Sequence, residues 1–132
     1  MINLAGILQS GIPLRPLVAL SVAQTINLPQ GTDASIAIRI TTPDGSLVDL
    51  SDIHTKVQLT VRRQGFPHDY PRIVKTATIT ANTATVSIAP SDTRDMYPGR
   101  YFYDVWLTKD GLRDEVIPMS TFQILQAVGA PP

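Results

Sequence analysis

Apolar and polar side chains alternate along most of the chain from Leu17 onward, in short runs that turn residues separate. In 35–41 and 56–63 every second residue is Ile, Val or Leu, with polar or small residues between them. A period of two puts alternate side chains on one face of a strand, so these runs predict half-buried β-strands. The segment 100–107 carries aromatic or aliphatic residues on both faces and predicts the strongest strand.

Turn signals separate the expected strands at intervals typical of a sandwich. In Pro43-Asp44-Gly45 the proline ring fixes φ and the glycine accepts a positive φ, which is typical of a turn. Asp110-Gly111 is a typical hairpin turn. Short strands about 8–12 residues apart predict an all-β fold, an immunoglobulin-like antiparallel β-sandwich with an extended N-terminal arm. The expected strands are 18–28, 35–41, 47–50, 56–63, 73–80, 83–89, 100–107, 112–119 and 121–125.

Residues 1–16 differ from the rest, because their apolar side chains follow neither period and glycine and proline interrupt them. A solvated tail is rarely this apolar. We therefore expect an N-terminal docking arm at 1–16, an immunoglobulin-like sandwich at 17–128 and a C-terminal tail at 129–132. The side chains expected to bury against a neighbouring subunit are Ile2, Leu4, Ile7, Leu8, Ile12 and Leu14.

The loop 64–71 carries two aromatic residues, Phe66 and Tyr70, each close to a proline, and basic residues flank it on both sides. A solvated sheet edge explains the basic residues most simply, since edge charges block unwanted strand pairing. Exposed aromatic and arginine side chains are also enriched in protein–protein interfaces. We expect Phe66 and Tyr70 to contact a partner protein.

Charge and composition narrow the function classes. Eleven Lys+Arg balance eleven Asp+Glu, which argues against a general nucleic-acid binder and against binding to an anionic membrane surface. Charged residues make up 17%, below the usual quarter or so, so partners or uncharged polar side chains are expected to cover the surface. With no secretory signal at the start and no long apolar run, we expect a protein made in the cytoplasm without a membrane anchor.

The residue types needed for catalysis or metal binding are present without the required spacing. There is no cysteine, so disulfides, thiolate zinc sites and thiol nucleophiles are excluded. His54 and His68 lack the close spacing of a metal site, and Asp49, Ser51 and His54 lie too close along the chain for a catalytic triad. No calcium loop or phosphate-binding glycine loop is present. We expect no enzyme activity, no cofactor, no metal and no small-molecule substrate.

Several motifs follow one another in a recognisable order: Ser91-Asp92-Thr93, Tyr97-Pro98-Gly99-Arg100-Tyr101, Tyr103-Asp104-Val105, Lys109-Asp110-Gly111, Thr121-Phe122-Gln123-Ile124 and the earlier stretch 42–51. Together they resemble one family, the immunoglobulin-like structural proteins of tailed bacteriophage virions. The chain is similar in particular to the N-terminal domain of upper baseplate proteins, over about residues 32–125. Those proteins usually continue into a long helical region that anchors a receptor-binding protein, whereas this sequence stops at Pro132.

The resemblance implies a structural protein of the virion, expected in the tail, baseplate, neck or fibre attachment. Its partners would be other virion proteins and further copies of itself, bound through the N-terminal arm and the loops. One alternative is a capsid decoration (cement) protein, which symmetry in the particle would distinguish. An alternative of another class is a carbohydrate-binding or host-surface-binding sandwich, which predicts a flat row of exposed aromatic side chains on one sheet.

Overall fold

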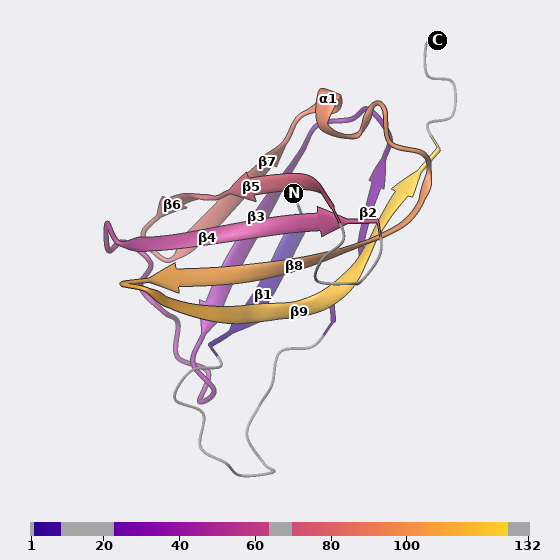
Figure 1. Ribbon diagram of the computed structural model, residues 1–132. Helices are drawn as coiled ribbons and strands as arrows, with labels where there is room; N and C mark the ends of the chain where they lie inside the picture. Colours follow the sequence, from indigo (N-terminus) through magenta and orange to yellow (C-terminus); the bar gives the residue numbers. More distant parts are fainter. Residues whose placement is uncertain (1, 9–22, 64–69, 127–132) are drawn as a thin grey trace.

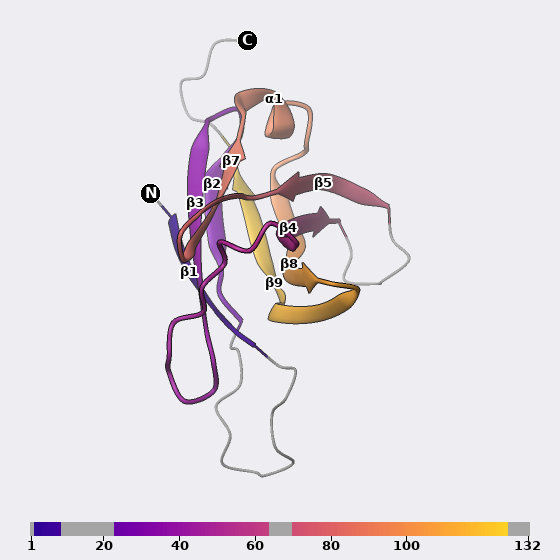
Figure 2. The same ribbon diagram turned by 90° about the vertical axis from the view of Figure 1, so that its left-hand side faces the viewer.

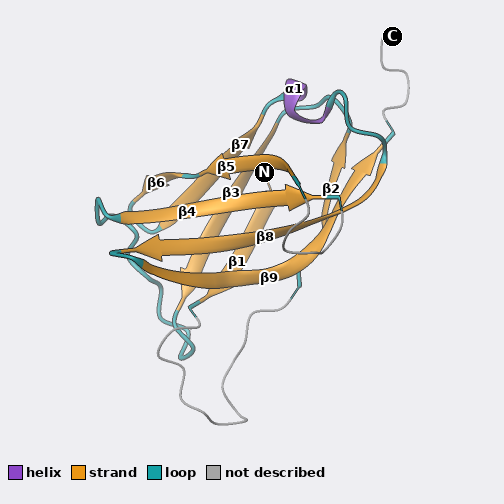
Figure 3. Ribbon diagram, in the orientation of Figure 1, coloured by secondary structure: helices purple, strands orange, loops and turns teal. Residues whose placement is uncertain are grey.

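In the computed structural model, the chain folds into two β-sheets that pack face to face (Figure 1 and Figure 3). The structure describes residues 2–8, 23–63 and 70–126. Of these described residues, 64% lie in strands and 4% in a helix, which confirms the predicted all-β sandwich. The elements are β1 (Ile2–Ile7), β2 (Ile26–Pro29), β3 (Ala34–Thr41), β4 (Thr55–Arg62), β5 (Pro71–Thr76), β6 (Thr78–Thr80), β7 (Thr83–Ile88), α1 (Pro90–Thr93), β8 (Gly99–Lys109) and β9 (Leu112–Leu125).

The strand order is that of an immunoglobulin domain. One sheet has the order β1-β3-β7-β6, and the other has the order β2-β9-β8-β4-β5. When the strands are lettered along the chain, the first sheet corresponds to the A-B-E-D sheet of an immunoglobulin domain and the second to the G-F-C sheet. In the second sheet, β2 and β5 are added at the two edges. Figure 2 shows the two layers, with β3 and β7 in one and β4 and β8 in the other.

Two strand pairs depart from the expected antiparallel arrangement. β1 pairs with β3 in parallel, and β2 pairs with β9 in parallel. The chain thus runs along one sheet as β1 and then along the other as β2 before β3 begins (Figure 1). The alternation of side chains shows which face of a strand is buried, but it contains no information about the direction of the neighbouring strand, so the sequence could not reveal this feature.

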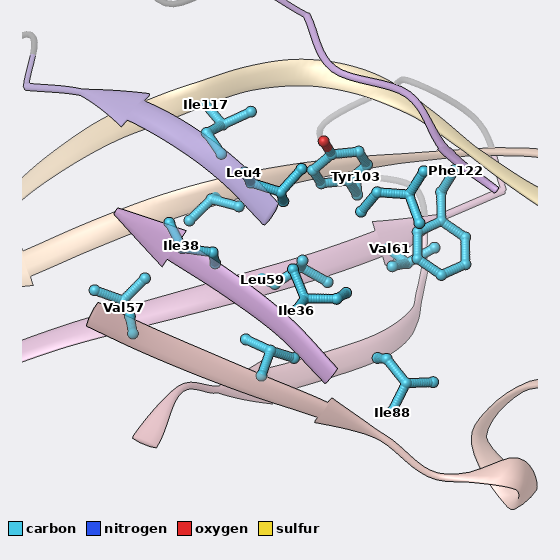
Figure 4. Close-up of a cluster of buried hydrophobic side chains, with 14 of the residues drawn as sticks. Leu4, Ile36, Ile38, Val57, Leu59, Val61, Ile88, Tyr103, Ile117 and Phe122 are labelled. Atoms are coloured by element: carbon cyan, nitrogen blue, oxygen red, sulfur yellow. The ribbon is translucent and has the colours of Figure 1, made fainter. Parts of the chain in front are cut away.

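The core lies between the sheets and is built by the period-two pattern. The three isoleucines of β3 and the alternate Val and Leu residues of β4 are fully buried. Figure 4 shows Ile36, Ile38 and the β4 side chains in one cluster with Leu4 of β1, Tyr103 of β8, and Ile117 and Phe122 of β9. The rings of Tyr103 and Phe122 pack edge to face, with their centroids 6.2 Å apart. Burial of such side chains from both sheets is the main source of the sandwich's stability.

A tyrosine corner closes the turn before β8. The Tyr101 hydroxyl donates a hydrogen bond to the carbonyl oxygen of Tyr97, at 2.9 Å. In immunoglobulin-like sandwiches a tyrosine at the start of strand F bonds back to the backbone a few residues upstream in this way. The segment Tyr97–Tyr101 therefore has a structural role.

Tyr103 gives a prediction for alkaline pH. Its hydroxyl is buried and donates a hydrogen bond to the carbonyl oxygen of Gln24, and burial raises the pKa of Tyr103 to about 12. The unfolded chain therefore loses this proton first, so stability should fall as the pH rises from about 10 to about 12. A titration of tyrosinate absorbance should show one late-ionising group that the Tyr103→Phe variant lacks. A wild-type profile identical to that of the variant would contradict this.

The expected strand 73–80 is divided between the sheets. β5 pairs with β4 in the five-stranded sheet, whereas β6 pairs with β7 in the four-stranded sheet. Ala77 lies between them, and its N–H donates to the carbonyl oxygen of Val57 at 2.8 Å. The hairpin expected around Ala81-Asn82 is confirmed for its final part, β6–β7, and Ala81 has a φ of 54° there.

The two expected closing strands form one long strand, β9. Its pairing with β8 becomes irregular between the partners of Tyr103 and Trp106. Val116 and Ile117 are consecutive but both buried, and Pro118 follows without an N–H to donate. A local irregularity at proline is why the sequence pattern suggested a break there.

The prediction of a strand at 47–50 is wrong. Thr42 and Ser46 close a tight turn by a backbone hydrogen bond of 2.8 Å, and Leu47 makes only an isolated bridge to Thr41. Leu50 is nevertheless fully buried and is tied by its N–H to the carbonyl oxygen of Ala81, at 3.1 Å. An apolar residue that packs into the core from a loop produces the same short pattern as a strand.

Candidate interaction surfaces

The first half of the expected docking arm lies in the sandwich itself. β1 occupies the edge of the four-stranded sheet, where Leu4 is 5% exposed and belongs to the core. Ile2 and Leu8 are half-buried and pack against that core, and Ile7 is half-buried. In this structure these side chains therefore contact their own domain, and burial against a neighbouring subunit stays a prediction.

Two local contacts hold β1 in place. The side-chain amide of Gln24 pairs with the backbone of Ala5: the Ala5 N–H donates to Gln24 Oε1 at 2.9 Å, and Gln24 Nε2 donates to the Ala5 carbonyl at 2.6 Å. A Cβ atom added to Gly6 would lie 3.1 Å from the Cβ of Val116, so β1 passes directly against β9. Glycine at this position allows that close approach of the two sheets.

Of the other expected contact residues, Tyr70 is the one that the structure describes. Ile12, Leu14 and Phe66 lie outside the described residues. Tyr70 is 72% exposed, and the Arg72 guanidinium lies 5.7 Å from its ring centroid. Val74, 49% exposed, follows on the outer face of β5, the edge strand of its sheet. This group, Tyr70 with Arg72 and Val74, is called the β5-edge surface below.

The end of the sandwich near the β8–β9 hairpin carries a second apolar surface that the sequence reading missed. Ile53 is 88% exposed and Leu112 is 68% exposed. An ion pair of 3.4 Å between Lys109 and Asp52 joins the hairpin to the turn that holds Ile53. Beside it opens a pocket of about 180 Å³, whose apolar lining is Leu8, Val48, Leu50, Leu107 and Leu112. The sequence did contain one signal of this surface, because Ile53 is an apolar residue inside a polar turn.

The outer face of β8 carries Trp106, which is half-buried. The Arg113 guanidinium lies over its ring, 4.7 Å from the centroid. Asp104, on the same face, forms an ion pair of 3.9 Å with Arg62, and burial together with repulsion by Asp104 raises the pKa of Glu115. Arg62 and Arg113 thus already have contacts within the domain, so this face offers less free binding chemistry than the two apolar surfaces.

Within the ranges that the structure describes, no group of three or more His, Asp or Glu side chains is placed to hold a metal ion. The helix α1 has four residues, and among the described residues no helix has the length and apolar character needed to cross a membrane. His54 lies in an exposed turn, where its N–H donates to the side chain of Asp52 at 2.8 Å. His68 lies outside the described residues.

Comparison with solved structures finds several chains of similar fold. No protein-family model matches the sequence, and no curated protein matches it. The N-terminal domain of phage TP901-1 ORF48 is similar in fold over 97% of this chain and 100% of that domain, with 12% sequence identity and a TM-score of 0.48. A likeness at this level establishes neither a family nor a function for this chain.

Proposed function

We propose that this chain is a non-enzymatic structural protein of a tailed-bacteriophage virion, in the tail, baseplate, neck or fibre attachment. It binds other virion proteins and further copies of itself, and it requires no nucleic acid, membrane, cofactor or small-molecule substrate. The sequence motifs of the tyrosine corner, the Asp110-Gly111 hairpin and β9 support this proposal, because they resemble that family in order and spacing.

The observation that carries the proposal is the β5-edge surface. An edge strand presents unpaired backbone groups with which another chain can pair. The exposed Tyr70 immediately precedes the edge strand β5, and its ring lies beside Arg72 of that strand. Tyrosine and arginine are the side chains that contribute most binding energy in many interfaces. The rigid two-layer core holds this surface and the β8–β9 end at fixed positions, as a structural block in an assembly requires.

The alternative of a carbohydrate-binding sandwich has less support. The exposed aromatic side chains of the described residues, Tyr70 and Tyr97, lie at an edge strand and in the turn before β8 and do not form a row on one sheet. Trp106 is half-buried beneath Arg113. A capsid decoration protein remains the alternative within the same class, and its position in the particle would distinguish it.

Replacing Tyr70 with alanine, together with Phe66, should weaken partner binding and leave the melting temperature nearly unchanged. Tyr70 is 72% exposed, so its removal takes little from the core, whereas an interface aromatic commonly contributes about 2 kcal/mol or more to binding. The measurement is the amount of tagged chain carried by phage particles purified from cells that express each variant.

Tyr97→Ala is the matched control for this experiment. Its side chain is 75% exposed, and its backbone carbonyl, which accepts the Tyr101 hydrogen bond, is unchanged. The control variant should enter particles as the wild type does, while the Phe66/Tyr70 variant should be depleted. Absence of the wild-type chain from particles would contradict the virion proposal itself, and equal incorporation of all three would contradict the role of the β5-edge surface.

A further inference from the structure

β1 is an edge strand whose pairing is not set by a turn. It runs parallel to β3, with Ile2 beside Ile36 and Ile7 beside Thr41. A tight turn cannot join parallel strands, and β1 is followed along the chain by β2, which lies in the other sheet. The register of β1 therefore depends only on the contacts that β1 makes in its place.

Those contacts form a specific slot. β3 supplies backbone partners along the whole of β1, and the Leu8 N–H donates to the Thr41 carbonyl at 2.9 Å. The core receives Leu4, and a side chain at position 6 would crowd Val116, at 3.1 Å from its Cβ atom. The Gln24 side chain then closes the open edge by pairing with the backbone of Ala5.

The residues that form this slot all lie at position 23 or later in the chain, whereas the residues that fill it are 2–8. The slot therefore binds the segment Ile2–Ile7 equally well whether that segment comes from the same chain or from another copy. A second copy of the chain presents the same leucine, the same glycine and the same backbone groups. Exchange of an identical element between protomers needs no new contact, which makes it a low-cost route to assembly.

We propose that the β3 edge is a strand-exchange site, in which β1 of one copy fills the slot of a neighbouring copy. This inference rests on the proposed function, since it names how copies of the chain join. The contacts are equal in the two arrangements, so concentration decides between them. A tethered segment has an effective concentration of about millimolar, and copies held in a virion reach a comparable local concentration. Strand addition to a sheet edge is also a recurrent mode of protein recognition.

A disulfide across β1 and β3 tests the exchange directly, because the native chain has no cysteine. Ala5 and Arg39 are register partners, both side chains are exposed, and paired strands lie within the range a disulfide spans. A chain with Ala5→Cys and a differently tagged chain with Arg39→Cys are unfolded together, refolded at high concentration and oxidised. If β1 exchanges, non-reducing electrophoresis should show a covalent dimer containing both tags.

The matched control replaces Ala5→Cys by Thr80→Cys, an exposed thiol at the opposite edge of the same sheet, on β6. Thiols paired at about millimolar effective concentration should give roughly tenfold more mixed dimer than thiols that collide at about 0.1 mM in solution. Circular dichroism verifies that each variant folds. If Ala5→Cys or Arg39→Cys does not fold, Asn3→Cys with Ala37→Cys, the next register pair on the same face of the sheet, replaces them.

Mixed dimer at the control level would overturn the exchange, whether β1 then stays in its own domain or the slot takes a strand from another protein. That result would leave the incorporation of the chain into particles untouched, so failure of this inference and failure of the proposed function are distinguishable. As a second measurement, the double variant Ala5→Cys/Arg39→Cys, oxidised as a dilute monomer, should no longer associate, and reduction should restore association.

Discussion

Replacing Phe122 with alanine is expected to lower the free energy of unfolding by about 3–5 kcal/mol. Phe122 is fully buried, and its ring packs edge to face on Tyr103, which is itself 1% exposed. Truncation leaves a cavity between the two sheets, and both the lost transfer free energy and the cavity contribute to the cost. Chemical denaturation of the two proteins, followed by circular dichroism, measures the difference.

Phe102→Ala is the matched control for the core. Phe102 lies one strand away on the opposite face of β8, is half-buried and is the register partner of Thr121. Its loss should cost about 1 kcal/mol, since only part of the side chain leaves water on folding. Equal losses for the two variants would show that the face of β8 and β9 assigned to the core is not the one that stabilises the protein.

Removal of residues 1–14 is expected to abolish association while leaving a folded but less stable sandwich. The deletion uncovers the β3 edge and the core site of Leu4, whose burial alone contributes about 1.5–3 kcal/mol. The remaining strands keep their pairing partners in both sheets, so the domain should still unfold cooperatively. Thermal unfolding measures the first effect, and sedimentation velocity measures the second.

A peptide of residues 1–14 added in trans is the control for this deletion. It should raise the melting temperature of the shortened chain, because a ligand that binds only the folded state stabilises it. A scrambled peptide should have no effect. An unfolded deletion product would show instead that β1 is indispensable to the core, and unchanged association would remove the N-terminal segment from the assembly contacts.

The sequence predicted those parts of the fold in which side-chain burial follows the strand period. β3, β4 and β8 are examples, because one face of each packs against the opposite sheet and the other does not. The tyrosine corner could also be expected, since Tyr101 follows a Pro-Gly turn at the start of the strongest strand. The division of 73–80 at Ala77 could not, because the alternation continues through a residue where the chain crosses between sheets.

The N-terminal segment shows where sequence reasoning stops for the interaction surfaces. Glycine and apolar residues without a period suggested an arm, yet the glycine at position 6 serves the close approach of β1 to Val116. The need for glycine at position 6 arises from the contact of two segments that are far apart in the chain, β1 and β9. The Gln24 amide, which pairs with Ala5, likewise has no local signal. Tyr70 was predictable as exposed chemistry, whereas Ile53 and Leu112 became visible as one surface only in the folded chain.

If other subunits cover this domain, the mass of the isolated full chain in solution should reveal it. Light scattering over a series of rising concentrations should give a mass that increases above the 14.4 kDa of one chain and reaches a small integer multiple. A mass of one chain at every concentration would contradict the account.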